Sequence, residues 1–292
     1  MKTLVFIHGR AQEHKDAAAL KEEWVGSLRS SLEQLGLDFP LPDAQVRFPY
    51  YGQTLFDLAS AAPGQAAEVI VRGAHGGAEE EFTREVLSEV IARAGVTDDQ
   101  IREVAGQDVV EKGPLNWKWV QAGLVALDRF VPGASSAAIA LMTQDVYRYL
   151  RNAGVRDVIE EGVRKALPEG EECVVVSHSL GTVVAYNLLR REGRQRNWSV
   201  PLLVTLGSPL GVTAITRSLK PIEHPSAVSS WFNAYDGGDV VALYPLDAER
   251  FPVLPTVENY GEVRNPTPNK HGITGYLGDP EVARRIHRAI TA

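Results

Sequence analysis

Short β-rich runs alternate with helical patterns along most of the chain. Residues 16–35, 182–191 and 281–290 have the patterns of helices. Strands are predicted at residues 3–7, 45–48, 173–176, 202–206, 229–235 and 253–257. Because a crossover helix lets successive strands run parallel, this alternation predicts the α/β class. We expect a mostly parallel sheet flanked by helices, folded as a single domain over residues 1–292.

Residues 53–145 depart from that alternation, since no strong strand pattern occurs among them. We expect a helical insertion here, placed where it acts as a cap over a site. Its aromatic side chains include Trp117 and Trp119, and Tyr51 comes directly after the second predicted strand. We predict that these three residues border a substrate pocket. The alternative, in which the two tryptophans only form the insertion's own core, stays open at this stage.

Residues 174–181, which read VVVSHSLG, carry the strongest functional signal. A β-branched run leads into a sharp turn centred on Ser179, and a helical pattern follows. A serine on such a turn projects its hydroxyl above the sheet edge and requires small residues two positions before and after it. The usual pattern has glycine at both positions, whereas this chain has Ser177 and Gly181. An ordinary strand–turn–helix with a capping serine is the alternative interpretation.

The turn at Ser179 resembles the nucleophile turn of the α/β-hydrolase superfamily, in which the chain order of the triad is Ser, then Asp or Glu, then His. Asp239, followed by two valines, is similar to the segment that carries the acid in many lipases and esterases. Asp236 is the alternative, although it is better suited to shaping the turn with the two glycines that follow it. His271 lies in a loop between the last predicted strand and the last predicted helix, where the base of this family belongs.

An acyl-transfer site also needs two backbone N–H groups for the oxyanion. We expect one from Leu180, the residue after the nucleophile. The segment His8-Gly9-Arg10 follows the first predicted strand and is similar to the His-Gly motif of the family's oxyanion loop. The resemblance makes Arg10 the expected second donor, and His8 is expected to be structural.

Taken together, these motifs are similar to the lipase- and esterase-like branch of the α/β-hydrolase superfamily, over residues 1–51 and 146–292. The resemblance implies a serine hydrolase that cleaves carboxylic esters, thioesters or lipid esters through an acyl-enzyme, without a cofactor. A non-catalytic binding or scaffold protein is the rival hypothesis, and the complete set of triad residues argues against it. An acyltransferase or peptidase with the same triad stays open, since the triad does not decide the leaving group or the acceptor.

The charge balance disfavours nucleic acid as a partner. The net charge is −7, and phosphate contacts require clustered Lys and Arg. The basic cluster at residues 190–196 sits where a helix should end, and cations there complement the helix dipole. A small-molecule or lipid ester is therefore the expected partner.

Cys173 is the single cysteine, so an internal disulfide is excluded. No cluster of His, Asp, Glu or Cys has metal-ligand spacing, and no glycine-rich phosphate loop is present, so we expect neither a metal nor another cofactor. The apolar run at residues 1–7 is too short for a signal peptide, and no apolar run reaches transmembrane length. These features predict a cytoplasmic protein.

Overall fold

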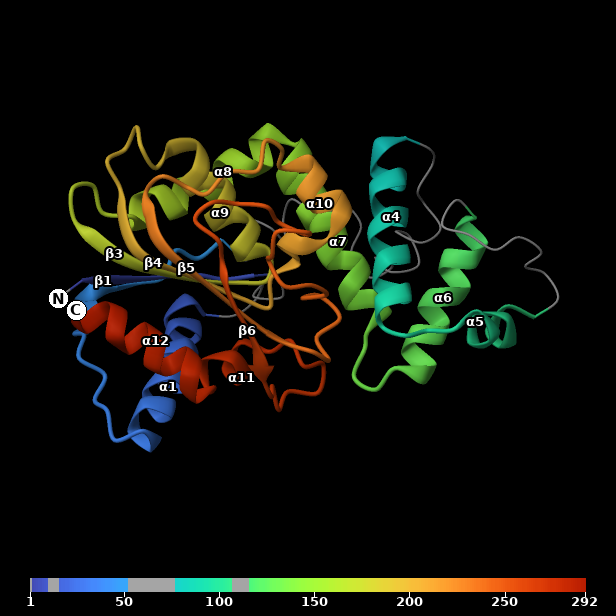
Figure 1. Ribbon diagram of the computed structural model, residues 1–292, viewed down its shortest axis with the longest axis horizontal. Coiled ribbons are helices and arrows are strands. Elements are labelled where there is room, and N and C mark those ends of the chain that lie inside the picture. Colours follow the sequence, from blue (N-terminus) through green and yellow to red (C-terminus); the bar gives the residue numbers. More distant parts are fainter. Residues whose placement is uncertain (1, 10–15, 52–76, 107–115) are drawn as a thin grey trace.

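The computed structural model describes residues 2–9, 16–51, 77–106 and 116–292 (Figure 1). These residues form one sheet in the order β2-β1-β3-β4-β5-β6, and every neighbouring pair of strands is parallel. The predicted α/β class, with a parallel sheet flanked by helices, is thereby confirmed. The strands are β1 (Thr3–Ile7), β2 (Val46–Arg47), β3 (Glu172–His178), β4 (Ser199–Leu206), β5 (Val228–Asp236) and β6 (Glu258–Val263).

Helices cover both faces of the sheet (Figure 1). One layer contains α1 (Ala17–Gln34), α11 (Ile273–Leu277) and α12 (Pro280–Thr291), and the other contains α8 (Ala153–Ala166) and α9 (Leu180–Glu192). Successive side chains of a strand point to opposite faces. Leu4 and Phe6 of β1 therefore pack in the core under the first layer, and Val5 and Ile7 pack in the core under the second. Burial on both faces explains why the central strands read as nearly continuous apolar runs.

The last strand is not at residues 253–257, as the sequence predicted, but at β6. Val253 and Val257 are buried, which is why their segment resembled a strand. However, Pro252 and Pro255 have no N–H to donate to a ladder, and this excludes the segment from the sheet interior. The true edge strand is polar, and its register with β5 is held in part by a hydrogen bond of 3.0 Å from Asn233 Nδ2 to the Oδ1 of Asn259.

Between β2 and β3 the described residues are helical. The helices are α4 (Ala78–Arg93), α5 (Asp98–Ala105), α6 (Trp117–Phe130) and α7 (Ser136–Arg151), followed by α8. Figure 1 shows α4, α5 and α6 beyond the end of the sheet at which the strands finish, with α7 running back toward the sheet. In sequence, α7 crosses the boundary predicted at residue 145, and it contacts α4 and α6 as well as α9. None of the described helices combines the length and the apolar character that crossing a membrane requires.

The turn between α6 and α7 lies against the loop that precedes α11. Gly133 in this turn has a φ of +79°, a conformation that favours glycine. A Cβ on Gly133 would also collide with the carbonyl oxygen of Pro268. Glycine at this position therefore lets the two loops pack backbone to backbone.

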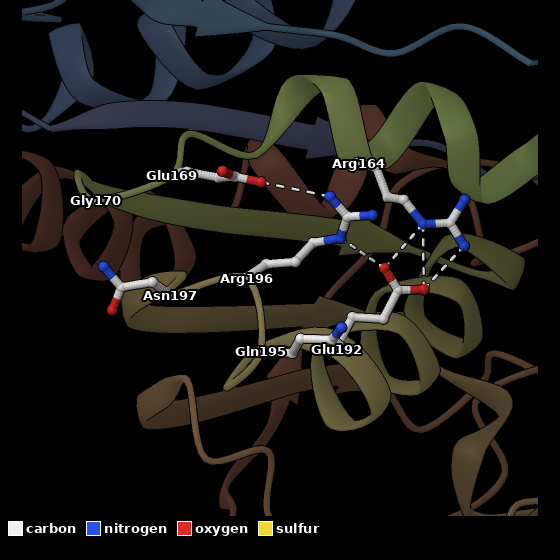
Figure 2. Close-up of a pocket in the computed structure, with 7 residues that line it drawn as sticks. All are labelled: Arg164, Glu169, Gly170, Glu192, Gln195, Arg196 and Asn197. Carbon is white, nitrogen blue, oxygen red and sulfur yellow. Dashed lines mark hydrogen bonds and ion pairs between the residues drawn. The ribbon is translucent and has the colours of Figure 1, made fainter.

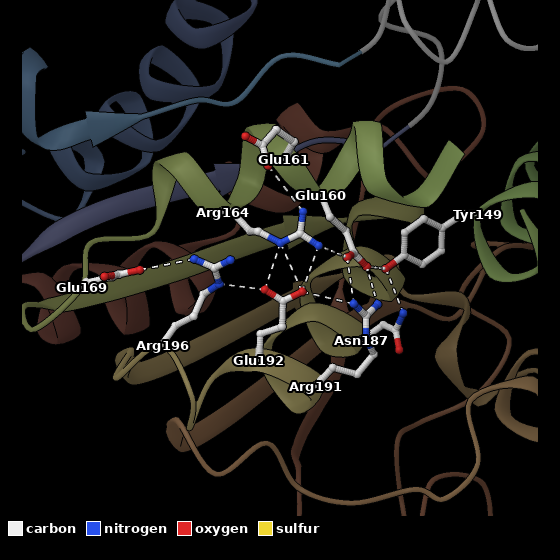
Figure 3. Close-up of polar contacts among 9 residues, drawn as sticks. All are labelled: Tyr149, Glu160, Glu161, Arg164, Glu169, Asn187, Arg191, Glu192 and Arg196. Carbon is white, nitrogen blue, oxygen red and sulfur yellow. Dashed lines mark hydrogen bonds and ion pairs between the residues drawn. The ribbon is translucent and has the colours of Figure 1, made fainter. Parts of the chain in front are cut away.

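Two arginines of the basic cluster, Arg191 in the last turn of α9 and Arg196 just after it, are paired with carboxylates (Figure 3). Arg191 donates to both oxygens of Glu160, at 2.9 and 3.1 Å, and Arg196 Nε donates to Glu192 at 2.8 Å. Arg164 of α8 donates to both of these glutamates. The cluster therefore joins α8 to α9, which fits the helix-end interpretation better than a role in binding phosphate.

Candidate active site

Ser179 occupies the turn between β3 and α9 in a strained backbone conformation. Its φ is 54° and its ψ is −128°, values that residues with a side chain rarely adopt. The turn packs tightly against the end of β1, because a Cβ on Gly181 would collide with the Ile7 carbonyl oxygen. A Cβ on Gly9 would come within 2.7 Å of the Ser179 Cβ. These contacts are the physical reason for the small residues around the serine.

Ser177 stands where the usual turn motif has glycine, and the structure accommodates it through one hydrogen bond. Its buried hydroxyl donates to the Val204 carbonyl oxygen of the neighbouring strand at 3.0 Å. A buried hydroxyl without a partner would destabilise the turn by about 1 to 3 kcal/mol. The hydroxyl therefore leaves the geometry of the turn intact.

Ser179, His271 and Asp239 lie in one hydrogen-bonded row. The Ser179 Oγ is 2.9 Å from His271 Nε2, and His271 Nδ1 is 2.7 Å from Asp239 Oδ2. Because a carboxylate only accepts, Nδ1 carries the imidazole proton, and this leaves Nε2 free to accept the serine proton. The Asp239 side chain is 0% exposed, whereas 16% of the His271 side chain reaches solvent.

Backbone and side-chain donors hold Asp239 in place after the end of β5. Its Oδ1 accepts from the Val241 N–H at 2.9 Å and from the Ala242 N–H at 3.4 Å. Its Oδ2 accepts from the Tyr276 hydroxyl at 2.6 Å as well as from His271. Burial alone would raise the pKa of Asp239, but the interactions with His271 and these donors outweigh it and lower that pKa below its usual range. Asp239 is therefore held as a carboxylate.

Asp236, the alternative acid, makes contacts of a different kind. Its Oδ1 accepts from the Gly238 N–H at 2.7 Å, and its Oδ2 accepts from the Asn265 N–H at 2.6 Å. The carboxylate thus ties the turn after β5 to the loop that leads to His271. This is the turn-shaping role that the sequence suggested for it.

His178 has a role that the sequence analysis missed. Its Nε2–H donates to the His271 carbonyl oxygen at 2.8 Å, and the two rings lie 4.7 Å apart between centroids. Burial, together with the neighbouring His271, lowers the pKa of His178 to about 3, so its ring is neutral at physiological pH. His178 therefore anchors the backbone of His271 without adding charge. No spacing rule reveals such a contact, because it joins positions 93 residues apart.

Of the two expected oxyanion donors, the structure describes Leu180. Leu180 is the first residue of α9, a position whose N–H has no acceptor within the helix. Arg10 lies outside the described residues. His8 has structural contacts just after β1, since its Nδ1 donates to the Gly9 carbonyl at 2.7 Å and its Nε2 accepts from the Tyr51 N–H at 3.0 Å. Burial lowers the pKa of His8 to about 4, so this ring is neutral as well.

A cavity of about 280 Å³ lies beside Ser179 and His271. Among the described residues its apolar wall comes largely from α7 and from the two valines after Asp239: Ala138, Ile139, Leu141, Met142, Val240 and Val241. In the sequence, the α7 part of this wall corresponds to the small and aliphatic run at residues 135–142.

The three predicted pocket residues have other surroundings in the described part of the chain. Tyr51 is buried, with its ring stacked on His8 at 3.9 Å between centroids. Trp117 is partly buried and packs against the core. Trp119 lines a separate cavity of about 630 Å³ beside α4, α5 and α10 (Thr213–Ser218).

Compared with models of known protein families, with curated proteins and with solved structures, the chain matches none. The interpretation of this site therefore rests on its own chemistry. A hydroxyl, an imidazole and a buried carboxylate, joined in that order, form the arrangement that activates a serine as a nucleophile.

Other candidate positions offer less chemistry. Cys173 is buried in β3, and burial raises the pKa of its thiol to about 12, so the thiol stays protonated. Within the part of the chain that the structure describes, no three His, Cys, Asp or Glu side chains are grouped to hold a metal. A cavity of about 800 Å³ near the start of β3 is lined by Arg164, Glu192 and Arg196, among others (Figure 2). These three groups already pair with one another.

Proposed function

We propose that this protein is a serine hydrolase of the α/β-hydrolase type that cleaves carboxylic esters. The observation that carries the proposal is the row of hydrogen bonds from Ser179 through His271 to the buried Asp239, next to an apolar cavity. The positions of the three residues support it further. Ser179 follows β3, Asp239 follows β5 and His271 follows β6, which is the chain order of this fold family.

In the proposed mechanism, His271 Nε2 takes the Ser179 proton as the Oγ attacks the ester carbonyl carbon. The carbonyl oxygen becomes an oxyanion, which the Leu180 N–H stabilises together with the second donor expected from Arg10. Asp239 stabilises the imidazolium that forms, and His271 then gives its proton to the departing alcohol. Water, deprotonated by the same imidazole, attacks the acyl-enzyme and releases the carboxylic acid and Ser179.

The cavity supports an apolar acyl group as the part of the substrate bound beside the serine. Its wall on α7 and the two valines after Asp239 offers carbon surface, and burial of each methylene there contributes about 0.8 kcal/mol. Leu141 on this wall is only partly buried, so its replacement disturbs the core less than that of its neighbours. Leu141 is therefore the position at which to test the acyl side.

Labelling with a fluorophosphonate probe tests the proposal. Wild type is expected to label and Ser179→Ala to lose the label, while Ser230→Ala, which removes an exposed serine of β5, labels like wild type. Hydrolysis of p-nitrophenyl esters of increasing chain length sizes the acyl site. Leu141→Trp is expected to slow long-chain esters about tenfold or more relative to the acetate. A folded wild type that neither labels nor hydrolyses any ester would refute the proposal and favour a non-catalytic binding protein.

A further inference from the structure

The Tyr276 hydroxyl contacts the same carboxylate oxygen as His271. Tyr276 is fully buried on α11, five residues after His271, and donates to Asp239 Oδ2 at 2.6 Å. The hydroxyl oxygen accepts in turn from the Asp236 N–H at 3.3 Å. Because a backbone N–H can only donate, the single proton of the hydroxyl is directed to Asp239. The direction of this hydrogen bond is therefore fixed by the fold.

Asp239 Oδ2 thus accepts two hydrogen bonds, one from each of two partners. The His271 Nδ1–H approaches it at 2.7 Å, and the Tyr276 O–H at 2.6 Å. The other oxygen, Oδ1, is engaged by the Val241 and Ala242 N–H groups. Four donors account for the hydrogen-bonding capacity of the carboxylate. The hydrogen bond from Tyr276 stabilises part of the negative charge on Asp239 and thereby weakens the attraction between this carboxylate and the His271 imidazole.

We propose that Tyr276 is a positioning residue that aims Oδ2 of Asp239 at His271 and weakens the hold of that carboxylate on the protonated imidazole. During turnover, the weaker hold lets His271 release its proton readily to the leaving group. This part of the role rests on the proposed function. The coupling itself is a property of the folded protein and exists whether or not the protein turns over a substrate.

The surroundings of His271 leave Asp239 as the charged group in direct contact with its ring. Among the described residues, His178 and Asp239 contact the His271 ring and Tyr276 contacts Asp239. The titratable groups one step further out are Asp236, Lys270 and His8, the last of which interacts with His178. Both other histidines are neutral, as their lowered pKa values indicate. Asp236 is bound to two backbone N–H groups, and Lys270 Nζ donates to the Asn265 carbonyl oxygen. The α7 residues that line the cavity on its far side are uncharged.

Tyr276→Phe tests the proposal, because it removes the hydroxyl and keeps the ring in the core. The readout is the titration midpoint of the His271 ring followed by NMR, with the signal assigned through its loss in His271→Gln. Without the tyrosine proton, Asp239 offers more negative charge to the imidazole, which then holds its own proton more tightly. The midpoint is expected to rise by about 0.5 to 1 pH unit. The acid limb of kcat/KM is expected to move upward by the same amount.

Tyr149→Phe is the matched control. Tyr149 is another fully buried tyrosine, and it donates to the buried Glu160 at 2.7 Å, within the ion-pair cluster of α8 and α9. Its loss is expected to reduce stability comparably and to leave the His271 midpoint unchanged. Replacing Tyr276 by 3-fluorotyrosine retains the fold and makes the hydroxyl a stronger donor, so it should lower the midpoint instead.

The outcomes separate this proposal from the proposed function. An unchanged His271 midpoint in folded Tyr276→Phe, or with 3-fluorotyrosine if the phenylalanine variant does not fold, would overturn the role of Tyr276. A shift of equal size in Tyr149→Phe would overturn it too, since the effect would then be a general loss of packing. If wild type is inactive but Tyr276→Phe still shifts the His271 midpoint, the hydrolase proposal is refuted and the coupling stands.

Discussion

Two buried carboxylates in this molecule share full burial and a tyrosine hydroxyl, but they differ in the basic group that binds them. Glu160 and Asp239 both have side chains with no exposed surface, and each accepts a tyrosine hydroxyl, at 2.7 and 2.6 Å respectively. Glu160 is bound by the guanidinium groups of Arg164 and Arg191 (Figure 3), whereas Asp239 is bound by the imidazole of His271.

The difference lies in what the partner can do with a proton. A guanidinium stays protonated in proteins, so Arg164 and Arg191 exchange no proton with Glu160, and their ion pairs with it hold α8 against α9. An imidazole changes charge near neutral pH and has a second nitrogen, which here faces the Ser179 hydroxyl. Burial and a tyrosine hydroxyl are therefore common to both carboxylates. Under the proposed function, what distinguishes Asp239 is a partner that can exchange protons.

The strongest test of this comparison is Asp239→Asn. The amide preserves the shape of the side chain but favours the wrong imidazole tautomer, so kcat/KM for an ester is expected to fall roughly 10⁴-fold. Initial rates with a p-nitrophenyl ester, normalised to the folded fraction, measure the effect. Retention of more than a tenth of the wild-type rate would mean that Asp239 is not the acid.

Glu160→Gln should have the opposite outcome, with little change in the activity of the folded molecules and a large loss of stability. The substitution leaves Arg164 and Arg191 facing a neutral amide, and breaking a buried ion pair typically costs about 3 to 5 kcal/mol. Urea unfolding measures the free energy, and ester hydrolysis below the transition measures the activity. If the activity of Glu160→Gln fell along with its stability even at urea concentrations where the variant stays folded, the two carboxylates would not be separable in function.

The smallest effect of a substitution is expected in the response of stability to mild acid, to which the buried His8 and His178 contribute. His178 and His8 have pKa values lowered to about 3 and about 4, so between pH 6 and pH 4.5 they are neutral when folded and protonated when unfolded. The unfolded state then binds more protons. The free energy of unfolding therefore falls by about 2 to 3 kcal/mol for each unit by which the pH is lowered. In His178→Gln, which retains a donor for the His271 carbonyl, unfolding free energies across this range should show about half that slope. An unchanged slope would mean that His178 is not buried as a neutral group.

How far the sequence predicted this structure depended on whether the signal was local. The turn at Ser179 was found because its small neighbours and its β-branched strand are adjacent in the chain. Asp239 and His271, which the family resemblance singled out, lie within hydrogen-bonding distance of each other. In contrast, β6 was misplaced because an edge strand needs only one apolar face and this one is largely polar.

Contacts between distant segments were beyond the reach of the sequence. The sequence analysis assigned no role to Tyr276, although its hydroxyl donates to Asp239, which lies 37 positions earlier in the chain. The cavity wall was expected from Trp117 and Trp119, because large aromatics are the more conspicuous residues, whereas the described wall uses the small and aliphatic side chains of α7. Which apolar helix faces the serine is decided by packing, and local patterns do not encode it.

The contact between Gly133 and Pro268 has a consequence for how this chain tolerates change. Any side chain at position 133 would push against the backbone of the loop that carries His271, and a φ of +79° adds strain to every residue but glycine. The position lies 46 residues before Ser179 (179 − 133) and contributes no functional group of its own. Sensitivity to substitution at Gly133 would show that one loop sets the position of another. Intolerance of substitution alone therefore does not identify a residue that takes part in chemistry.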